Sequence, residues 1–213
     1  MRWLFDIENP VMRYILKIFD CMCLSILWLV CCLPILTAGA ATTALYATVY
    51  RYLRKDEGHL LRTFLGAFRE NWKKSTLVWL VLLAAGILLG VDMLVFRTMA
   101  LQGQFLGKLY WLILLLIGVW ITWLVYAFAY CARFHGSVKD VLRGSALLML
   151  LHPLRALTVF LPTAAGILVM CMVPGFLSIV PVVMILTCSM TLEKLFVLHG
   201  GSNAPQQSEG EDL

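Results

Sequence analysis

Long apolar runs alternate with short charged segments along most of the chain. The four clearest runs are residues 75–95, 109–132, 154–173 and 176–196. Each is about 20 residues long, which is the length that an α-helix needs to cross a ~30 Å hydrocarbon core. A helix on the surface of a soluble protein keeps a polar face toward water, and these runs have none. The pattern predicts an all-α, polytopic membrane helix bundle.

A further apolar stretch, residues 18–53, is too long for one ordinary span. Pro34 and Gly39 lie near its middle. Proline removes a backbone donor from a helix, and glycine permits a sharp turn. Two short spans, residues 17–33 and 35–53, are one interpretation, and a single span followed by a surface helix is the other. The first gives six spans in total and the second gives five.

The distribution of charge favours six spans. Hydrophobic residues make up 62% of the chain and charged residues 14%, with a net charge of +5. The cations flank the apolar runs, so orientation in a bilayer explains them better than a nucleic-acid partner does. With six spans and both termini in the cytoplasm, all but Arg97 and Lys108 of the 17 Lys and Arg residues lie inside. This is the asymmetry that the positive-inside rule requires.

The chain therefore predicts one integral membrane domain, residues 1–199, with no room for a soluble enzymatic domain. The last segment, residues 200–213, is poor in apolar residues and rich in Gly, Ser, Gln and acidic residues. Such a composition cannot bury a core, so we expect a disordered cytoplasmic tail.

Two inner segments predict amphipathic helices. In residues 56–74 the apolar side chains share one helical face, which we expect to insert into the inner leaflet. They are Leu60, Leu61, Phe64, Leu65, Phe68 and Trp72. Arg62 and Arg69 lie elsewhere on this helix and form a candidate inner-face docking site, although the helix would equally serve as a brace on the lipid surface. The second helix, residues 137–151, is predicted to begin after Ser137 as its N-cap and to end before Pro153.

The segment from residue 37 to 52 is rich in Ala, Thr and Tyr. Small residues let helices approach closely, and threonine hydroxyls bond across helices or back to their own backbone. We expect this helix in the middle of the bundle, where its polar residues either pack tightly or line a polar path. The candidate residues are Thr37, Gly39, Thr42, Thr43 and Tyr46.

No catalytic signature stands out in the remaining sequence. The chain has no P-loop, nucleophile elbow or HExxH motif, and the spacing of its seven cysteines does not match a zinc site. We expect no enzyme, no metal and no cofactor. Glu193 lies at a predicted helix end and is expected at the interface. Gly86 and Gly90 form a GxxxG pattern that permits close helix crossing within the bundle or in a homo-oligomer.

The run LPILTAGAATTALY at residues 33–46, with Asn9-Pro10 before it and the Phe64, Phe68 and Asn71-Trp72 helix after it, resembles the bacterial YesL-like family. The resemblance extends to about Gly200. It implies a small multi-pass protein of the bacterial plasma membrane, often associated with sugar uptake and two-component regulation. That family is itself a domain of unknown function, so the resemblance implies no binding residues.

We therefore expect a non-enzymatic accessory or regulatory protein. Besides the lipid bilayer, its partner would be a carbohydrate transporter or a sensor kinase, contacted through the inner amphipathic helices. The alternative is a small oligomeric transporter whose path is lined by residues 37–46.

Overall fold

The computed structural model describes residues 10–54, 59–102, 105–134, 136–173 and 179–200, and every regular element in these ranges is helical. The α-helices are α1 (Pro10–Cys32), α2 (Ala38–Thr48), α3 (Leu60–Leu101), α4 (Tyr110–Arg133), α5 (Val138–Leu151), α6 (Pro153–Met172) and α7 (Val180–Gly200). Three short elements connect them: the 3-10 helices η2 (Ile35–Thr37) and η4 (Phe105–Leu109), and the π-helix η3 (Val49–Arg54), which continues α2. The predicted all-α class is confirmed for these ranges.

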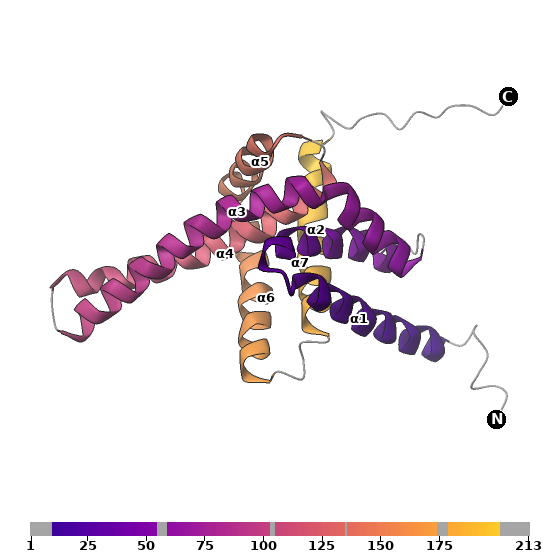
Figure 1. Ribbon diagram of the computed structural model, residues 1–213, viewed down its shortest axis with the longest axis horizontal. Coiled ribbons are helices and arrows are strands. Elements are labelled where there is room, and N and C mark those ends of the chain that lie inside the picture. Colours follow the sequence, from indigo (N-terminus) through magenta and orange to yellow (C-terminus); the bar gives the residue numbers. More distant parts are fainter. Residues whose placement is uncertain (1–9, 55–58, 103–104, 135, 174–178, 201–213) are drawn as a thin grey trace.

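The helices form a body and an arm (Figure 1). α3 and α4 lie side by side as a long hairpin, while α6 and α7 form a second pair that crosses it. α1 and α2 pack near the beginning of α3, and α5 lies on the side of the hairpin opposite to α6. The outer part of the hairpin, residues 87–101 and 110–116, extends beyond the other helices and is called the arm below.

Three helices in the described ranges are long and apolar enough to cross a membrane: α3, the segment Gly107–Arg133 and α6. α7 contains a shorter apolar segment, Val180–Glu193. A membrane protein agrees with these lengths, because about 20 apolar residues span a bilayer. Six spans would also require α1, α2 with η3, and α7 to cross, so that count stays a prediction.

The predicted turn at Pro34 is present. α1 ends at Cys32, and the chain passes through η2 into α2, which runs back past α1 (Figure 1). The Thr37 hydroxyl closes the turn by donating to the carbonyl oxygens of Cys31 at 2.7 Å and Pro34 at 2.8 Å. Residues 18–53 therefore contain two helices, as both interpretations of this stretch require, and a membrane crossing by the second helix stays a prediction.

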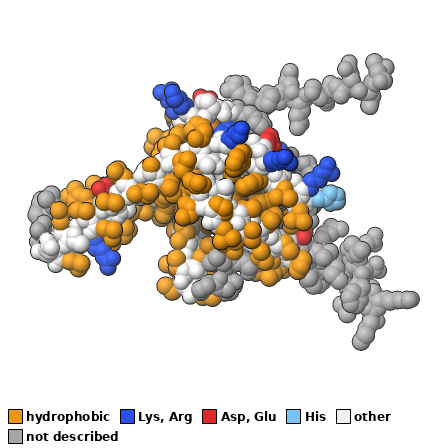
Figure 2. All heavy atoms as spheres, viewed as in Figure 1, with side chains coloured by type: hydrophobic (Ala, Val, Ile, Leu, Met, Phe, Trp, Pro, Cys, Tyr) orange, Lys and Arg blue, Asp and Glu red, His pale blue; other side chains and the backbone are white. Residues whose placement is uncertain are grey.

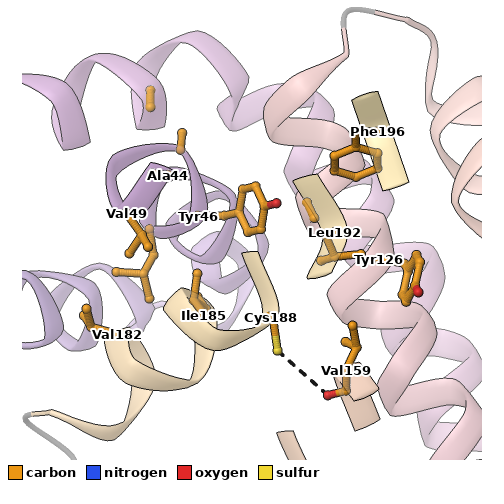
Figure 3. Packing of buried hydrophobic residues seen from close by; sticks show 14 of the residues in the cluster. Ala44, Tyr46, Val49, Tyr126, Val159, Val182, Ile185, Cys188, Leu192 and Phe196 are labelled. Atoms are coloured by element: carbon orange, nitrogen blue, oxygen red, sulfur yellow. Dashed lines mark hydrogen bonds between the residues drawn. The ribbon is translucent and has the colours of Figure 1, made fainter. Parts of the chain in front are cut away.

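α2 lies at the centre of the body. Nine of its 11 residues are buried, including Ala40, Ala41 and Ala44, which are fully inaccessible. Its neighbours are so close that a Cβ at Gly39 would overlap the Trp79 side chain and lie 2.8 Å from the Ser75 carbonyl oxygen. The small side chains predicted this burial correctly. Figure 3 shows the surrounding core, in which Val182 and Ile185 of α7 face α2.

α3 corrects two expectations. The amphipathic segment, residues 56–74, and the span, residues 75–95, were expected as separate helices, the second of which would end at residue 95. Instead α3 runs unbroken from Leu60 to Leu101. Its buried residues recur every three or four positions across the junction, so both parts pack on the body without a break. They are Phe64, Ala67, Asn71, Ser75, Val78 and Leu82.

The predicted apolar face of residues 56–74 is also divided. Phe64 is fully buried in the protein core, whereas Leu61, Leu65 and Trp72 remain 58%, 52% and 45% exposed. The first part of α3 is therefore held by packing against α2, and only its exposed apolar flank is left for lipid.

The second amphipathic helix agrees closely with its prediction. The Ser137 hydroxyl accepts from the Asp140 backbone N–H at 3.4 Å, and the Asp140 carboxylate accepts from the Ser137 N–H at 2.8 Å, which forms a capping box. The side-chain hydrogen bond with Ser137, followed by the backbone one, lowers the pKa of Asp140. α5 ends at Leu151, and Pro153 begins α6. Apart from Gly200, the last residue of α7, the predicted tail lies outside the described residues.

Candidate functional site

A buried carboxylate is the most unusual group in the body. Glu193 is only 6% exposed although it carries a carboxylate on the largely apolar α7. The Tyr46 hydroxyl of α2 donates to its Oε1 at 3.2 Å, and Nη2 of Arg133 at the end of α4 lies 3.2 Å from its Oε2. Figure 3 shows Tyr46 projecting from α2 toward α7. The three side chains join three helices that are far apart in sequence.

The surroundings explain why the charge on Glu193 is tolerated. A buried carboxylate is costly unless it is paired and hydrogen-bonded, and here it has both an ion pair and a hydroxyl donor. The Arg133 side chain is 35% exposed, so it remains partly hydrated while it holds Glu193. Its guanidinium carbon also lies 4.5 Å from the centre of the Tyr50 ring on η3, a cation–π contact.

A small cavity, the chamber, adjoins this cluster. Its volume is about 80 Å³, which is enough for a few water molecules. Its polar lining comes from four elements: Tyr46 of α2, Tyr50 and Arg51 of η3, Glu70 and Asn71 of α3, and Arg133 of α4. Asn71 is buried and donates to the Ala67 carbonyl at 3.3 Å, which fixes its side chain in the wall.

A wider surface depression, the vestibule, lies beside the chamber. Its volume is about 480 Å³, and Arg51, Ala67 and Glu70 line both spaces, so the two are adjacent. The remaining lining residues are His59, Arg62, Thr63 and Gly66. Figure 2 shows cationic side chains gathered on the body at the side where α5 and the beginning of α3 lie, with hydrophobic side chains over much of the rest.

The structure separates the two predicted docking residues. Arg62 lines the vestibule, whereas Arg69 is exposed on the same helix outside both spaces. Lys73, one turn further, is exposed as well. By helical spacing these three cations lie on the side of α3 that is turned away from the buried Phe64 and Asn71.

The five predicted polar or tight-packing residues also divide. Tyr46 borders the chamber, while the hydroxyls of Thr42 and Thr43 donate to the carbonyls of Ala38 and Gly39 within α2. Thr42 additionally accepts a hydrogen bond from the Trp28 indole at 3.3 Å. Thr37 closes the turn before α2, and Gly39 permits the contact with α3. Four of the five therefore serve turn formation and packing.

The pairing of Glu193 with Arg133 was not predicted from the sequence. Glu193 was expected at the membrane interface, which stays a prediction, but its burial against Arg133 was not expected. The only available signal was a charged residue within an apolar helix, which marks functional positions in membrane segments. Local spacing carries no information on which helix supplies its partner.

Residues 21–93 match the model of a family described as a protein of unknown function, DUF624. The match covers less than half of the chain, from the middle of α1 to the later part of α3, and it includes Tyr46, Tyr50, Arg51, Glu70 and Asn71. Arg133 and Glu193 lie beyond it. No curated protein and no solved structure matches the chain.

Proposed function

We propose that the protein is a non-enzymatic accessory or regulatory protein of a carbohydrate uptake or sensing system in the bacterial plasma membrane. It crosses the membrane six times with both termini in the cytoplasm. It acts by docking an acidic cytoplasmic segment of a sugar transporter or a sensor kinase. The resemblance to the YesL-like family supports this direction, and the match at residues 21–93, to a family of unknown function, is consistent with that resemblance.

The observation that carries the proposal is the cationic flank of α3, formed by Arg62, Arg69 and Lys73. All three side chains are exposed. The opposite side of the same helix is fixed to the body by the buried Phe64, so the flank is displayed on a rigid support. Charged surfaces of this kind steer and select partners of opposite charge.

The transporter alternative is less well supported by α2. A polar path along this helix would need threonine hydroxyls directed into open space, yet Thr42 and Thr43 bond to their own helix. Ala40 and Ala44 are fully buried between neighbouring helices. These contacts favour a packing role for α2 and, with it, the accessory function.

Charge reversal at Arg62 and Arg69 tests the proposal. The Arg62→Glu/Arg69→Glu variant should lose a partner that is crosslinked to the wild type in native membranes, while its membrane insertion stays normal. Because reversal also weakens attraction to anionic lipid, the Arg62→Gln/Arg69→Gln variant separates the two effects. Arg97→Glu/Lys108→Glu, at the far end of the hairpin, is the matched control and should keep the partner.

The accessory function would be contradicted if two results were obtained together. One is an unchanged set of crosslinked partners in the Glu variant. The other is movement of a sugar or an ion across liposomes by the purified protein. They would move the assignment to the small oligomeric transporter.

A further inference from the structure

The described lining of the vestibule carries more basic than acidic side chains. Arg51, His59 and Arg62 line it against a single acidic residue in the described lining, Glu70. Both arginines and the histidine are exposed, so their donors can reach a ligand without repacking the core. Arginine presents a planar fork of donors that matches the oxygen atoms of a phosphate, and the hydroxyl of Thr63 adds a further donor.

Gly66 keeps the vestibule open. A Cβ added at Gly66 would have no neighbouring atom within 4 Å, although this glycine lies in the middle of a helical segment. Glycine in a helix interior is unfavourable by about 1 kcal/mol relative to alanine, so local helix stability does not explain its presence. Any larger side chain here would project into the space that the arginines surround.

The vestibule faces water rather than lipid. At 100° per residue, Thr63, Gly66 and Glu70 lie on the flank of α3 opposite to Leu61, Leu65 and Trp72. Those three apolar side chains are 45–58% exposed and are the ones suited to the membrane. A ligand in the vestibule therefore arrives from the aqueous side. With a volume of about 480 Å³, the vestibule lies in the range of small-molecule sites.

The chamber offers a second, different surface to the same ligand. Beyond the shared residues Arg51 and Glu70, its walls carry the phenol rings of Tyr46 and Tyr50 and the amide of Asn71. A few polar groups in fixed positions next to a charged mouth are typical of sites that orient small polar molecules. The chamber is small enough to admit only a compact group.

We propose that the vestibule and chamber bind a water-soluble, phosphate-bearing small molecule. Its phosphate lies between Arg51, Arg62 and His59 in the hollow above Gly66, and its compact polar end is directed to the chamber. The site shares Arg62 with the cationic flank. Arg51 and Gly66 belong to the site alone, whereas Arg69 and Lys73 lie outside it, so phosphate binding and partner docking can be lost separately.

The test uses the full chain in a maltoside detergent, with inorganic phosphate as the probe and chloride at matched ionic strength as the reference. A ligand that binds only the folded state raises the thermal midpoint in a saturable way. We expect this rise for the wild type. Gly66→Leu changes no charge and introduces a good helix former, but its side chain occupies space in the vestibule. The apparent phosphate affinity should therefore fall at least tenfold. Gly90→Leu on the same helix, where a Cβ also meets open space, should leave it unchanged.

Charge variants give an independent readout. Arg51→Gln/Arg62→Gln should weaken phosphate binding at least tenfold, whereas Arg69→Gln/Lys73→Gln should not. Glu70→Gln removes the only acid in the described lining, so it should strengthen binding. Absence of a saturable phosphate effect in the wild type, or equal affinity in Gly66→Leu, would overturn the site.

A final experiment distinguishes a soluble phosphate from the headgroup of a lipid. The protein is placed in nanodiscs with or without phosphatidylglycerol. Stabilisation by this lipid that disappears in Gly66→Leu, with no effect of inorganic phosphate, would overturn the soluble ligand and assign the site to a lipid headgroup.

Discussion

The body around α2 and the arm are both strongly apolar, yet they bury their side chains to very different extents. Ala40 and Ala44 of α2 are fully inaccessible, whereas Ile87, Leu88 and Leu94 of the arm are 60–66% exposed. The arm consists of two helices that contact mainly each other, and its surface is largely hydrophobic (Figures 1 and 2). In lipid, large apolar side chains gain nothing by moving inside, so small side chains and close contact decide which helix is central.

Three glycines show the same difference in packing between the body and the arm at single positions. Gly39 meets the backbone and side chains of α3, and Gly86 lies against the Trp120 ring of α4, while Gly90 meets nothing within 4 Å. Only the first glycine of the predicted GxxxG pattern is therefore used for packing in this chain. The Trp120 indole also donates to the Leu82 carbonyl at 3.1 Å, which holds α4 on α3 where the arm begins.

The largest effect should come from filling the contact at Gly39. Gly39→Leu would overlap Trp79 and the Ser75 carbonyl, and overpacking of this kind costs about 3 kcal/mol at its upper range. Gly90→Leu should be neutral or slightly stabilising, because its site is open. Unfolding of both variants by a denaturing detergent, followed by tryptophan fluorescence, measures the difference. Equal stability would mean that α2 is not the close-packed centre of the body.

Breaking the Arg133–Glu193 pair should have the next largest effect, with a clear asymmetry. Arg133→Met removes the ion pair of the buried Glu193 and keeps the hydrogen bond from the Tyr46 hydroxyl. It should cost about 2 kcal/mol, less than breaking a fully buried pair, because Arg133 is partly hydrated. Glu193→Gln keeps the Tyr46 bond and leaves a cation that reaches water, so it should cost less. The same unfolding assay, with Asp92→Asn in the arm as control, tests the order. A greater loss in Glu193→Gln would contradict it.

A smaller effect is expected at the root of the arm. Trp120→Phe keeps an aromatic ring against Gly86 and removes the indole donor to the Leu82 carbonyl. One hydrogen bond contributes about 0.5–1.5 kcal/mol net to stability. Because the Leu82 carbonyl still has its helical partner, the loss of stability in Trp120→Phe should lie at the lower end of this range. Increased hydrogen exchange in residues 110–121, with the core of α2 unchanged, would support this role. Equal changes in both regions would count against it.

The smallest effect concerns pH at the cap of α5. Because the folded-state pKa of Asp140 is lowered by Ser137, this carboxylate stabilises the helix start above the ordinary pKa of aspartate. The contribution is lost as the pH falls through the lowered pKa. The protection of the Val138–Val141 amides should fall more steeply in acid in the wild type than in Ser137→Ala, which loses the hydroxyl bond and keeps the backbone bond to Asp140. An identical pH profile in both proteins would refute the coupling.

The sequence predicted elements whose cause is local. Pro34 with Thr37 specifies the turn before α2, Ser137 caps α5, and Pro153 begins α6. The small residues of α2 predicted its burial, because in a membrane close approach needs them.

The errors arose where the cause lies in another helix. The helical face containing Phe64 and Trp72 looks continuous in the sequence, but α2 covers only one side of it, so Phe64 is buried and Trp72 is not. The position of Glu193 depends on Tyr46 and Arg133, which are 147 and 60 positions away along the chain. No periodicity within α7 encodes these partners. For the same reason the vestibule, which needs η3 and α3 together, could not be predicted beyond the exposure of Arg62.

The unbroken length of α3 has a mechanical consequence. At 1.5 Å per residue, a helix of 42 residues is about 63 Å long. Its beginning borders the vestibule and its other end forms the tip of the arm, with no proline in between to act as a hinge. α3 is therefore one continuous rod that packs against α2 and α4. If the rod tilted by a few degrees about these contacts, its two ends, one beside the vestibule and the other in the arm, would each move by an ångström or more.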